Sequence, residues 1–136
     1  VTIGDPRLKE VRMGALVSIA QRENVKEQVA KIAKTASIVY GNIDELEIIG
    51  ADAQKGAFLK PILLREDHPF KNEACHTIEA FGPVSTIMPY KNMDEAIELA
   101  QMGKGSRVSY IENYKHACTR ICDMRCISHC AEIGVI

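Results

Sequence analysis

Apolar residues recur at helical spacing in two stretches of the chain. After Ser18 they fall every three or four positions, while charged residues occupy the other faces, which predicts an amphipathic helix lying on a sheet. Ser18, with Gln21 three residues later, fits a capping box at the start of this helix. A second helix is expected after Asn92, with Glu95 at the matching capping position and Gly103 as its end.

Short apolar runs of strand length lie between and after these helices. Strands are expected at 37–40, 57–64, 84–90, 107–111 and 132–136, and a further helix at 113–127. Pro61 favours an edge position or a bulge for the second strand, because proline donates no ladder hydrogen bond. The stretch 65–83 has no clear period, and loops of this length are more often functional or poorly ordered. Alternating strands and helices predict an α/β fold with a largely parallel sheet flanked by helices.

Composition narrows the class of protein. The net charge is −1 and the acidic and basic residues are mixed, so we expect no nucleic-acid partner. No apolar run approaches the ~18–20 residues that span a bilayer, so no membrane segment is expected. Five cysteines without a secretory signal indicate a reducing compartment, and we predict a cytoplasmic protein. A chain of 136 residues that starts at Val1 rather than Met fits a piece of a longer protein.

Five motifs follow one another at plausible spacings. They are Gly-Asp-Pro at 4–6, Met-Gly-Ala-Leu-Val at 13–17, Gly-Ala-Phe-Leu-Lys-Pro-Ile-Leu at 56–63, Glu-Ala-Phe-Gly-Pro-Val at 79–84 and Asp-Glu-Ala-Ile-Glu-Leu-Ala at 94–100. In this order they resemble the aldehyde dehydrogenase superfamily, with Ala15 where the family usually has Pro. The likeness spans residues 4 to about 106, and the tail 107–136 is divergent. It implies that residues 1–136 are a C-terminal fragment of the catalytic domain, with the Rossmann-like cofactor domain upstream.

A narrower resemblance concerns the substrate. His76 before the 79–84 motif, Val-Arg-Met-Gly at 11–14 and Gly-Lys-Gly-Ser at 103–106 are similar to the dehydrogenase half of the bifunctional ring-opening enzymes of phenylacetate degradation. This implies oxidation of a CoA-linked semialdehyde to the acid. Two alternatives stay open: another aldehyde dehydrogenase with a simple aliphatic substrate, and a non-catalytic module that binds a partner. The segments that line the substrate lie mostly outside this chain, so its sequence does not choose among them.

The resemblance also assigns roles to residues. In the family, a Cys thiolate attacks the aldehyde, hydride passes to the nicotinamide, and a Glu-activated water releases the acid. That Cys and that Glu lie upstream of the Gly-Asp-Pro motif, so this chain is expected to hold no catalytic residue and to be inactive alone. The resemblance implies that Glu79 binds the nicotinamide ribose hydroxyls and that Phe81 packs against the nicotinamide of NAD or NADP. It further implies a homo-oligomer acting on a small aldehyde.

The cysteines raise two other hypotheses. Cys75 beside His76 invites a nucleophile–base reading, but sequence neighbours rarely face each other as a catalytic pair, and we assign no role to His76. The tail cysteines are four residues apart, at Cys118, Cys122, Cys126 and Cys130. Four ligands along one straight helix cannot surround an ion, so a thiol-lined core face is favoured over a zinc or iron–sulfur site. A poorly folded tail is the third possibility, and no metal site is predicted.

Overall fold

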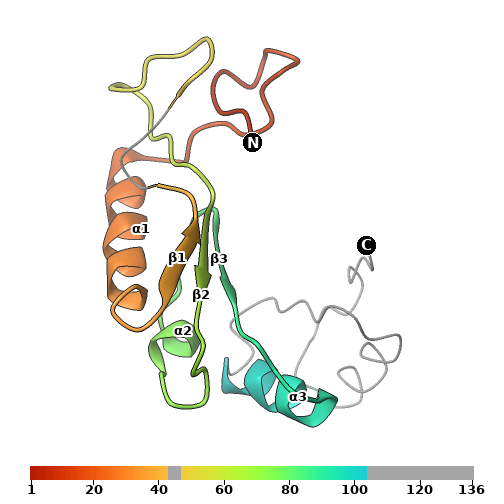
Figure 1. Ribbon diagram of the computed structural model, residues 1–136. Helices are drawn as coiled ribbons and strands as arrows, with labels where there is room; N and C mark the ends of the chain where they lie inside the picture. Colours follow the sequence, from red (N-terminus) through yellow and green to blue (C-terminus); the bar gives the residue numbers. More distant parts are fainter. Residues whose placement is uncertain (43–46, 104–136) are drawn as a thin grey trace. The chain divides into compact units, whose positions relative to one another are not determined.

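The computed structural model describes residues 1–42 and 47–103, and the chain divides into two compact units, 1–88 and 89–136. The first unit contains α1 (Ile19–Ile32), β1 (Ser37–Tyr40), β2 (Ile62–Arg65), α2 (Ala74–Thr77) and β3 (Val84–Ile87), as Figure 1 shows. The second contains α3 (Met93–Met102). The elements expected at 107–111, 113–127 and 132–136, and the four tail cysteines, lie outside the described residues.

Helix α1 begins where the sequence predicts and packs on the sheet. The Ser18 hydroxyl accepts a hydrogen bond from the Gln21 backbone N–H at 3.1 Å, which satisfies one of the free donors of the first turn. The Gln21 side chain reaches back to the N–H of Val17 rather than to that of Ser18. The apolar stripe of α1 forms one hydrophobic core with β2 and with the residues that precede β1 and β2. The buried residues of this core are Val25, Val29, Ile32, Ala36, Leu59, Ile62 and Leu64. The helix ends at Ile32, and a turn carries the chain to Ala36.

The three described strands form a mixed sheet in the order β1-β2-β3. Strand β2 pairs with β1 antiparallel and with β3 parallel, so the α/β fold is confirmed while the described sheet is less parallel than expected. Between β1 and β2 the register shifts between Ile38 and Tyr40. Along β2, Ile62 and Leu64 face α1 and are buried, whereas the residues that alternate with them face the other way.

The placement of Pro61 differs from expectation. Strand β2 starts at Ile62, immediately after the proline, and lies in the centre of the described sheet rather than at an edge. Because Pro61 precedes the first paired residue, its missing N–H costs the ladder nothing; the N–H of Ile62 donates to the Pro83 carbonyl at 2.8 Å. The predicted strand 57–64 is therefore shorter: residues 57–61 lie outside it, with 57–59 buried and 60–61 partly buried.

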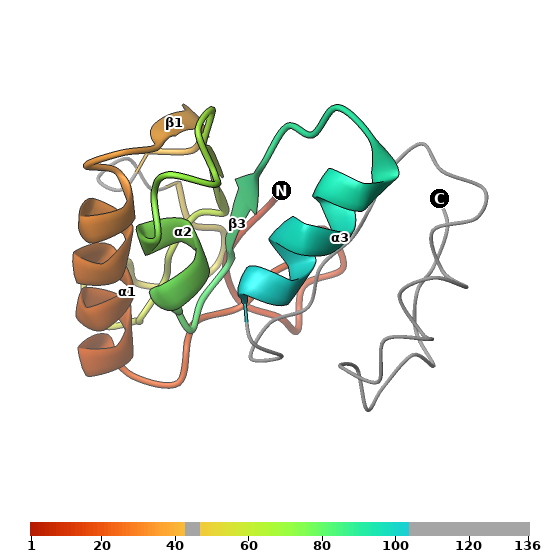
Figure 2. The same cartoon turned by 90° about the horizontal axis from the view of Figure 1, so that it is seen from below.

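The connection 66–83 joins the parallel strands β2 and β3. Parallel neighbours require a crossover, because the chain must return to the end of the sheet from which β2 started. The stretch predicted as a long loop without clear period contains the short helix α2, which contacts α1 (Figure 2). Strand β3 ends at Ile87, earlier than the predicted residue 90.

The second unit is described only around α3. Asn92 caps the helix as predicted, its side chain accepting from the Glu95 N–H at 3.0 Å. The Glu95 carboxylate in turn accepts from the N–H of Lys91 at 2.8 Å. Met93 and Ala96 are buried together, and the helix ends before Gly103. None of the described helices is long and apolar enough to cross a membrane.

Candidate cofactor-binding site

The two predicted cofactor-binding residues lie on the last part of the connection, residues 78–81, which we call the 78–81 strip. Ile78 is in an extended conformation directly after α2. Ile78 and Ala80 are partly buried and pack against the core beneath α1. Glu79 and Phe81 alternate with them and are exposed, Phe81 to 65%. The period of two in an extended segment thus turns a carboxylate and an aromatic ring away from the core.

The strip is fixed to α1 by the side chain of Gln21. Its Nε2 donates to the Phe81 carbonyl at 2.7 Å, while its Oε1 accepts from the Val17 N–H at 3.2 Å. One amide therefore links the start of α1 to a residue far along the chain. The sequence predicts Gln21 as a helix-capping residue only, because local spacing carries no signal for a long-range partner such as Phe81.

Close approach to α1 also explains the glycine of the Phe-Gly-Pro motif. A Cβ placed on Gly82 would lie 2.9 and 3.0 Å from the two γ-methyl carbons of Val25. Such contacts are tighter than side chains normally make, so any larger residue would push the strip away from the helix. After Gly82, Pro83 leads into β3, and the Pro83 carbonyl accepts from the start of β2. The end of the strip is therefore held to α1 through Phe81 and, two residues later, to β2 through Pro83.

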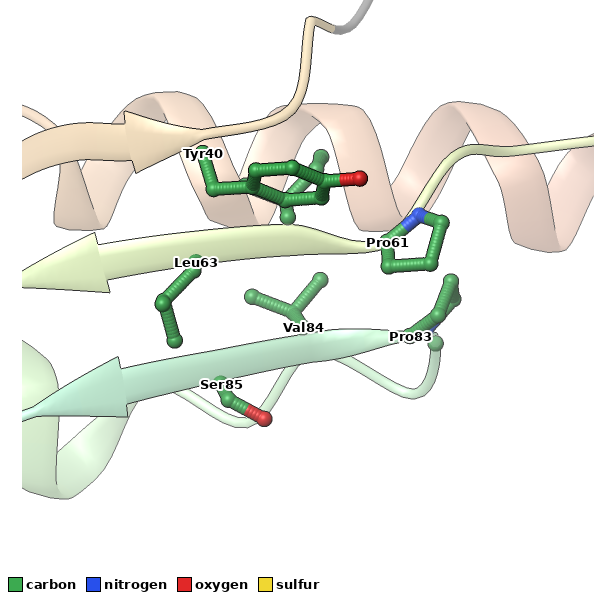
Figure 3. A pocket seen from close by; sticks show the side chains of 8 residues that line it. Tyr40, Pro61, Leu63, Pro83, Val84 and Ser85 are labelled. Carbon is green, nitrogen blue, oxygen red and sulfur yellow. The ribbon is translucent and has the colours of Figure 1, made fainter. Parts of the chain in front are cut away.

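A hollow lies over the three strands and includes Gly82 and Pro83, the two residues that follow the strip. Its volume is about 360 Å³, and Figure 3 shows side chains from all three strands around it. The lining residues are Tyr40, Pro61, Ile62, Leu63, Gly82, Pro83, Val84 and Ser85. The lining is mainly apolar, with the hydroxyls of Tyr40 and Ser85 as its polar side-chain groups, and it includes no carboxylate or cation.

Cys75 and His76 are both buried, and neither faces solvent as a reacting group would. The Cys75 thiol donates to the Asn72 carbonyl at 3.2 Å, and His76 Nε2 lies 2.8 Å from the Pro69 carbonyl. These contacts give His76 the structural role that the sequence analysis did not assign. Across the described ranges 1–42 and 47–103, no group of three His, Cys, Asp or Glu side chains is placed to hold a metal ion.

The Gly-Asp-Pro motif forms a separate structural feature of the first unit. The Asp5 carboxylate accepts from the Arg7 guanidinium and backbone, and the hydrogen bonds from Arg7 lower the pKa of Asp5 to about 2. Gly4 lies against residue 49, where an added Cβ would be 2.0 Å from the Ile49 carbonyl oxygen. The motif thus ties two loops together, and it contributes no group to the 78–81 strip.

Comparison with known proteins identifies the family of the chain. The sequence profile of the aldehyde dehydrogenase family matches residues 1–113. A 3,4-dehydroadipyl-CoA semialdehyde dehydrogenase of Aromatoleum evansii is 38% identical over 109 residues, which are 80% of this chain and 21% of that protein. Protein MaoC of Klebsiella aerogenes is 43% identical over 95 residues, 69% of this chain and 27% of that protein. The chain thus spans about a quarter or less of the length of these relatives.

Solved structures show the same fold. A betaine aldehyde dehydrogenase of Staphylococcus aureus, in complex with NAD+, superposes with a TM-score of 0.62 at 22% identity over 75% of this chain and 19% of that chain. A Mycobacterium tuberculosis aldehyde dehydrogenase complexed with NAD+ gives a TM-score of 0.56 at 29% identity over 74% of this chain and 20% of that chain. From the profile match and these likenesses, the chain belongs to the aldehyde dehydrogenase family.

Proposed function

We propose that this chain supplies part of the cofactor wall of an NAD(P)-dependent aldehyde dehydrogenase. The observation that carries the proposal is the outward orientation of Glu79 and Phe81 on a strip whose inner side chains are packed in the core. An exposed carboxylate has two acceptor oxygens, which suits two neighbouring ribose hydroxyls. An exposed aromatic ring provides a stiff wall for the flat nicotinamide. The residues present therefore fit the group.

In this proposal the residues of the chain bind and orient, and they transfer no proton. Glu79 accepts hydrogen bonds from the nicotinamide ribose, and Phe81 limits the positions that the nicotinamide ring can take. When bound, NAD or NADP supplies the hydride acceptor of the oxidation. The nucleophilic Cys and the general-base Glu come from segments of the complete enzyme outside residues 1–136. Residues 1–136 alone are accordingly expected to oxidise no aldehyde.

We further propose that the complete enzyme oxidises a CoA-linked semialdehyde. We propose that this enzyme is a homo-oligomer located in the cytoplasm. The support is the similarity to the Aromatoleum evansii protein, whose name gives such a substrate. Degradation of phenylacetate or a related aromatic acid is the pathway we propose. A simple aliphatic aldehyde is the alternative substrate, and kcat/KM measured for both classes with the complete enzyme distinguishes them.

The test of the cofactor role is Glu79→Gln in the complete enzyme. Glutamine keeps the shape but removes the charge, and a hydrogen bond to a charged acceptor contributes roughly 1.5–3 kcal/mol. We expect the cofactor KM to rise, or the hydride-transfer rate to fall, by about ten-fold or more. Ester hydrolysis by the nucleophilic Cys needs no hydride transfer and should be retained.

Glu73→Gln is the matched control, because Glu73 is an exposed acid on the same connection whose side chain makes no capping hydrogen bond. It should leave both activities unchanged. Unaltered dehydrogenase kinetics in Glu79→Gln, or equal loss of both activities, would remove the cofactor-binding role from Glu79.

A further inference from the structure

Glu66 breaks the pattern of the sheet at the point where the connection leaves β2. Ile62 and Leu64 alternate along β2 toward α1 and form its core. The same alternation brings residue 66 to the α1 side, where an apolar residue is expected. The sequence has a glutamate there instead, and its side chain is 1% exposed. A carboxylate in a core position is a local violation of the folding pattern, and such violations concentrate at sites with a functional constraint.

Hydrogen bonds from the connection hold this carboxylate. Glu66 Oε1 accepts from the backbone N–H of His68 at 2.8 Å and from Asn72 Nδ2 at 2.9 Å. Burial raises the pKa of Glu66, but the hydrogen bonds from His68 and Asn72 oppose it, and the pKa lies below the ordinary value of 4.5. Its Oε2 is buried and has no hydrogen-bond partner among the described residues. The carboxylate therefore holds the start of the connection through Oε1.

A chain of contacts continues from this anchor to the 78–81 strip. Asn72, bound to Glu66, presents its carbonyl to the Cys75 thiol at the start of α2. The N–H groups of His76 and Thr77 donate to the Glu73 carbonyl, each at 2.9 Å. The N–H of Ile78 donates to the Ala74 carbonyl at 3.0 Å. Each contact fixes the next segment, so the orientation of the anchor determines where the strip begins.

We propose that Glu66 is a positioning residue for cofactor binding: its buried carboxylate folds the 66–77 part of the connection and thereby places Glu79 and Phe81. This inference rests on the proposed function of the strip. Glu66 itself touches no cofactor. The strip packs through Ile78 and Ala80 and is held at Phe81 by Gln21. Its other end continues from α2, a single short turn of helix that contacts α1 and is joined to Glu66 through Asn72.

Two substitutions in the complete enzyme test the proposal. Glu66→Leu restores the apolar pattern and removes both hydrogen-bond acceptors. Glu66→Gln keeps one acceptor oxygen and the shape. Asp67→Asn is the matched control, since Asp67 is the neighbouring acid, is exposed, and pairs with Arg65 at 2.7 Å. For Glu66→Leu, the cofactor KM should rise by about ten-fold or more, as expected when a distant change misplaces binding groups, while Cys-dependent ester hydrolysis is retained. Glu66→Gln should show a smaller rise and Asp67→Asn none.

Hydrogen exchange in residues 1–136 supplies a readout that does not depend on activity. In Glu66→Leu, the amides of residues 68–78 should exchange about ten-fold or more faster, while the amides of α1 keep their protection. Unchanged exchange in 68–78 overturns the proposal, and so does faster exchange with an unchanged cofactor KM. Equal loss of protection in α1 and in 68–78 also overturns it, because Glu66 would then support the whole core. Failure of the strip's own function is recognised separately, by unaltered kinetics in Glu79→Gln.

Discussion

The connection between β2 and β3 has two halves that are built in opposite ways. The first half, residues 66–77, buries polar groups: the carboxylate of Glu66, the imidazole of His76 and the thiol of Cys75 all lie inside and all make hydrogen bonds. The second half, residues 78–83, exposes the side chains of Glu79 and Phe81, with Phe81 65% accessible. It is held instead through its backbone and through Ile78 and Ala80.

This difference separates, within one short segment, the groups that support the fold from the groups that are available for binding. Polar groups that are buried must find partners, so the first half is expected to tolerate little change. Exposed side chains contribute little to folding stability, so Glu79 and Phe81 are available to bind a ligand. The comparison predicts that substitutions in the first half act through the fold and reach cofactor binding only by displacing the strip. Substitutions of Glu79 and Phe81 should change cofactor kinetics with little effect on the free energy of unfolding.

The largest effect is expected at His76. Its ring is 5% exposed and lies 2.8 Å from the Pro69 carbonyl. His76→Ala removes buried packing and leaves that carbonyl without its partner, which should lower the free energy of unfolding by about 2–3 kcal/mol. Urea denaturation of residues 1–136 followed by circular dichroism measures this. His68→Ala, in which an exposed histidine is lost, should change it by less than about 0.5 kcal/mol.

Phe81→Ala should show the reverse behaviour, and it is the sharpest test of the comparison. Although phenylalanine is among the larger side chains, its removal should alter the free energy of unfolding by less than about 0.5 kcal/mol. In the complete enzyme, loss of the aromatic wall should raise the cofactor KM by about ten-fold, since ring contacts of this kind contribute about 1.5 kcal/mol. Phe81→Leu should lie between. A destabilised Phe81→Ala chain with unchanged cofactor kinetics would invert the comparison.

The two halves also differ in how far the sequence could predict them. The Glu-Ala-Phe-Gly-Pro-Val motif is a continuous run of residues, so Glu79 and Phe81 could be selected from the sequence. The alternation of inner and outer side chains is consistent with that assignment. The helix starts at Ser18 and Asn92 were predictable for the same reason, because capping depends on residues three positions apart. The cofactor role itself stays a prediction.

The first half was harder to predict, because its hydrogen bonds join residues at irregular separations within a loop, where no periodic pattern marks the partners. Glu66 in sequence is one of two adjacent acids, and nothing local distinguishes the buried one from the exposed Asp67. The signal available was its place two residues beyond Leu64 in the β2 alternation. The edge position predicted from Pro61 was wrong for a related reason. Local rules assign proline to an edge strand, whereas here it lies one residue before the hydrogen-bonded part of β2 begins.

Gln21→Ala tests the link between the strip and α1 and should have a moderate effect. It removes the hydrogen bonds to Phe81 and Val17, and a neutral hydrogen bond contributes about 1 kcal/mol. We expect the cofactor KM of the complete enzyme to rise about three- to five-fold. Gln28→Ala, on the same helix, should leave it unchanged, because Gln28 bonds only to Lys31 at 3.4 Å in the described contacts. An equal effect of both substitutions would attribute the change to α1 stability rather than to the strip.

The smallest expected effect is a pH dependence confined to the first half. Burial raises the pKa of Glu66, but hydrogen bonds from His68 and Asn72 oppose it, and the pKa is lowered in the folded chain. A carboxyl with a lowered folded pKa stabilises the fold above its unfolded pKa, and that stabilisation is lost as the pH falls through the folded value. Protection of the amides of 68–78 should therefore decrease as the pH falls below about 4.5, after correction for the intrinsic pH dependence of exchange. Asp5, with a pKa of about 2, titrates lower and lies on a different loop.

The chain carrying Glu66→Leu lacks the titrating group, so its corrected protection in 68–78 should be low and independent of pH over the same range. If wild type and Glu66→Leu lose protection in parallel as the pH falls, the acid sensitivity belongs to other carboxyls, and Glu66 does not anchor the connection through its charge.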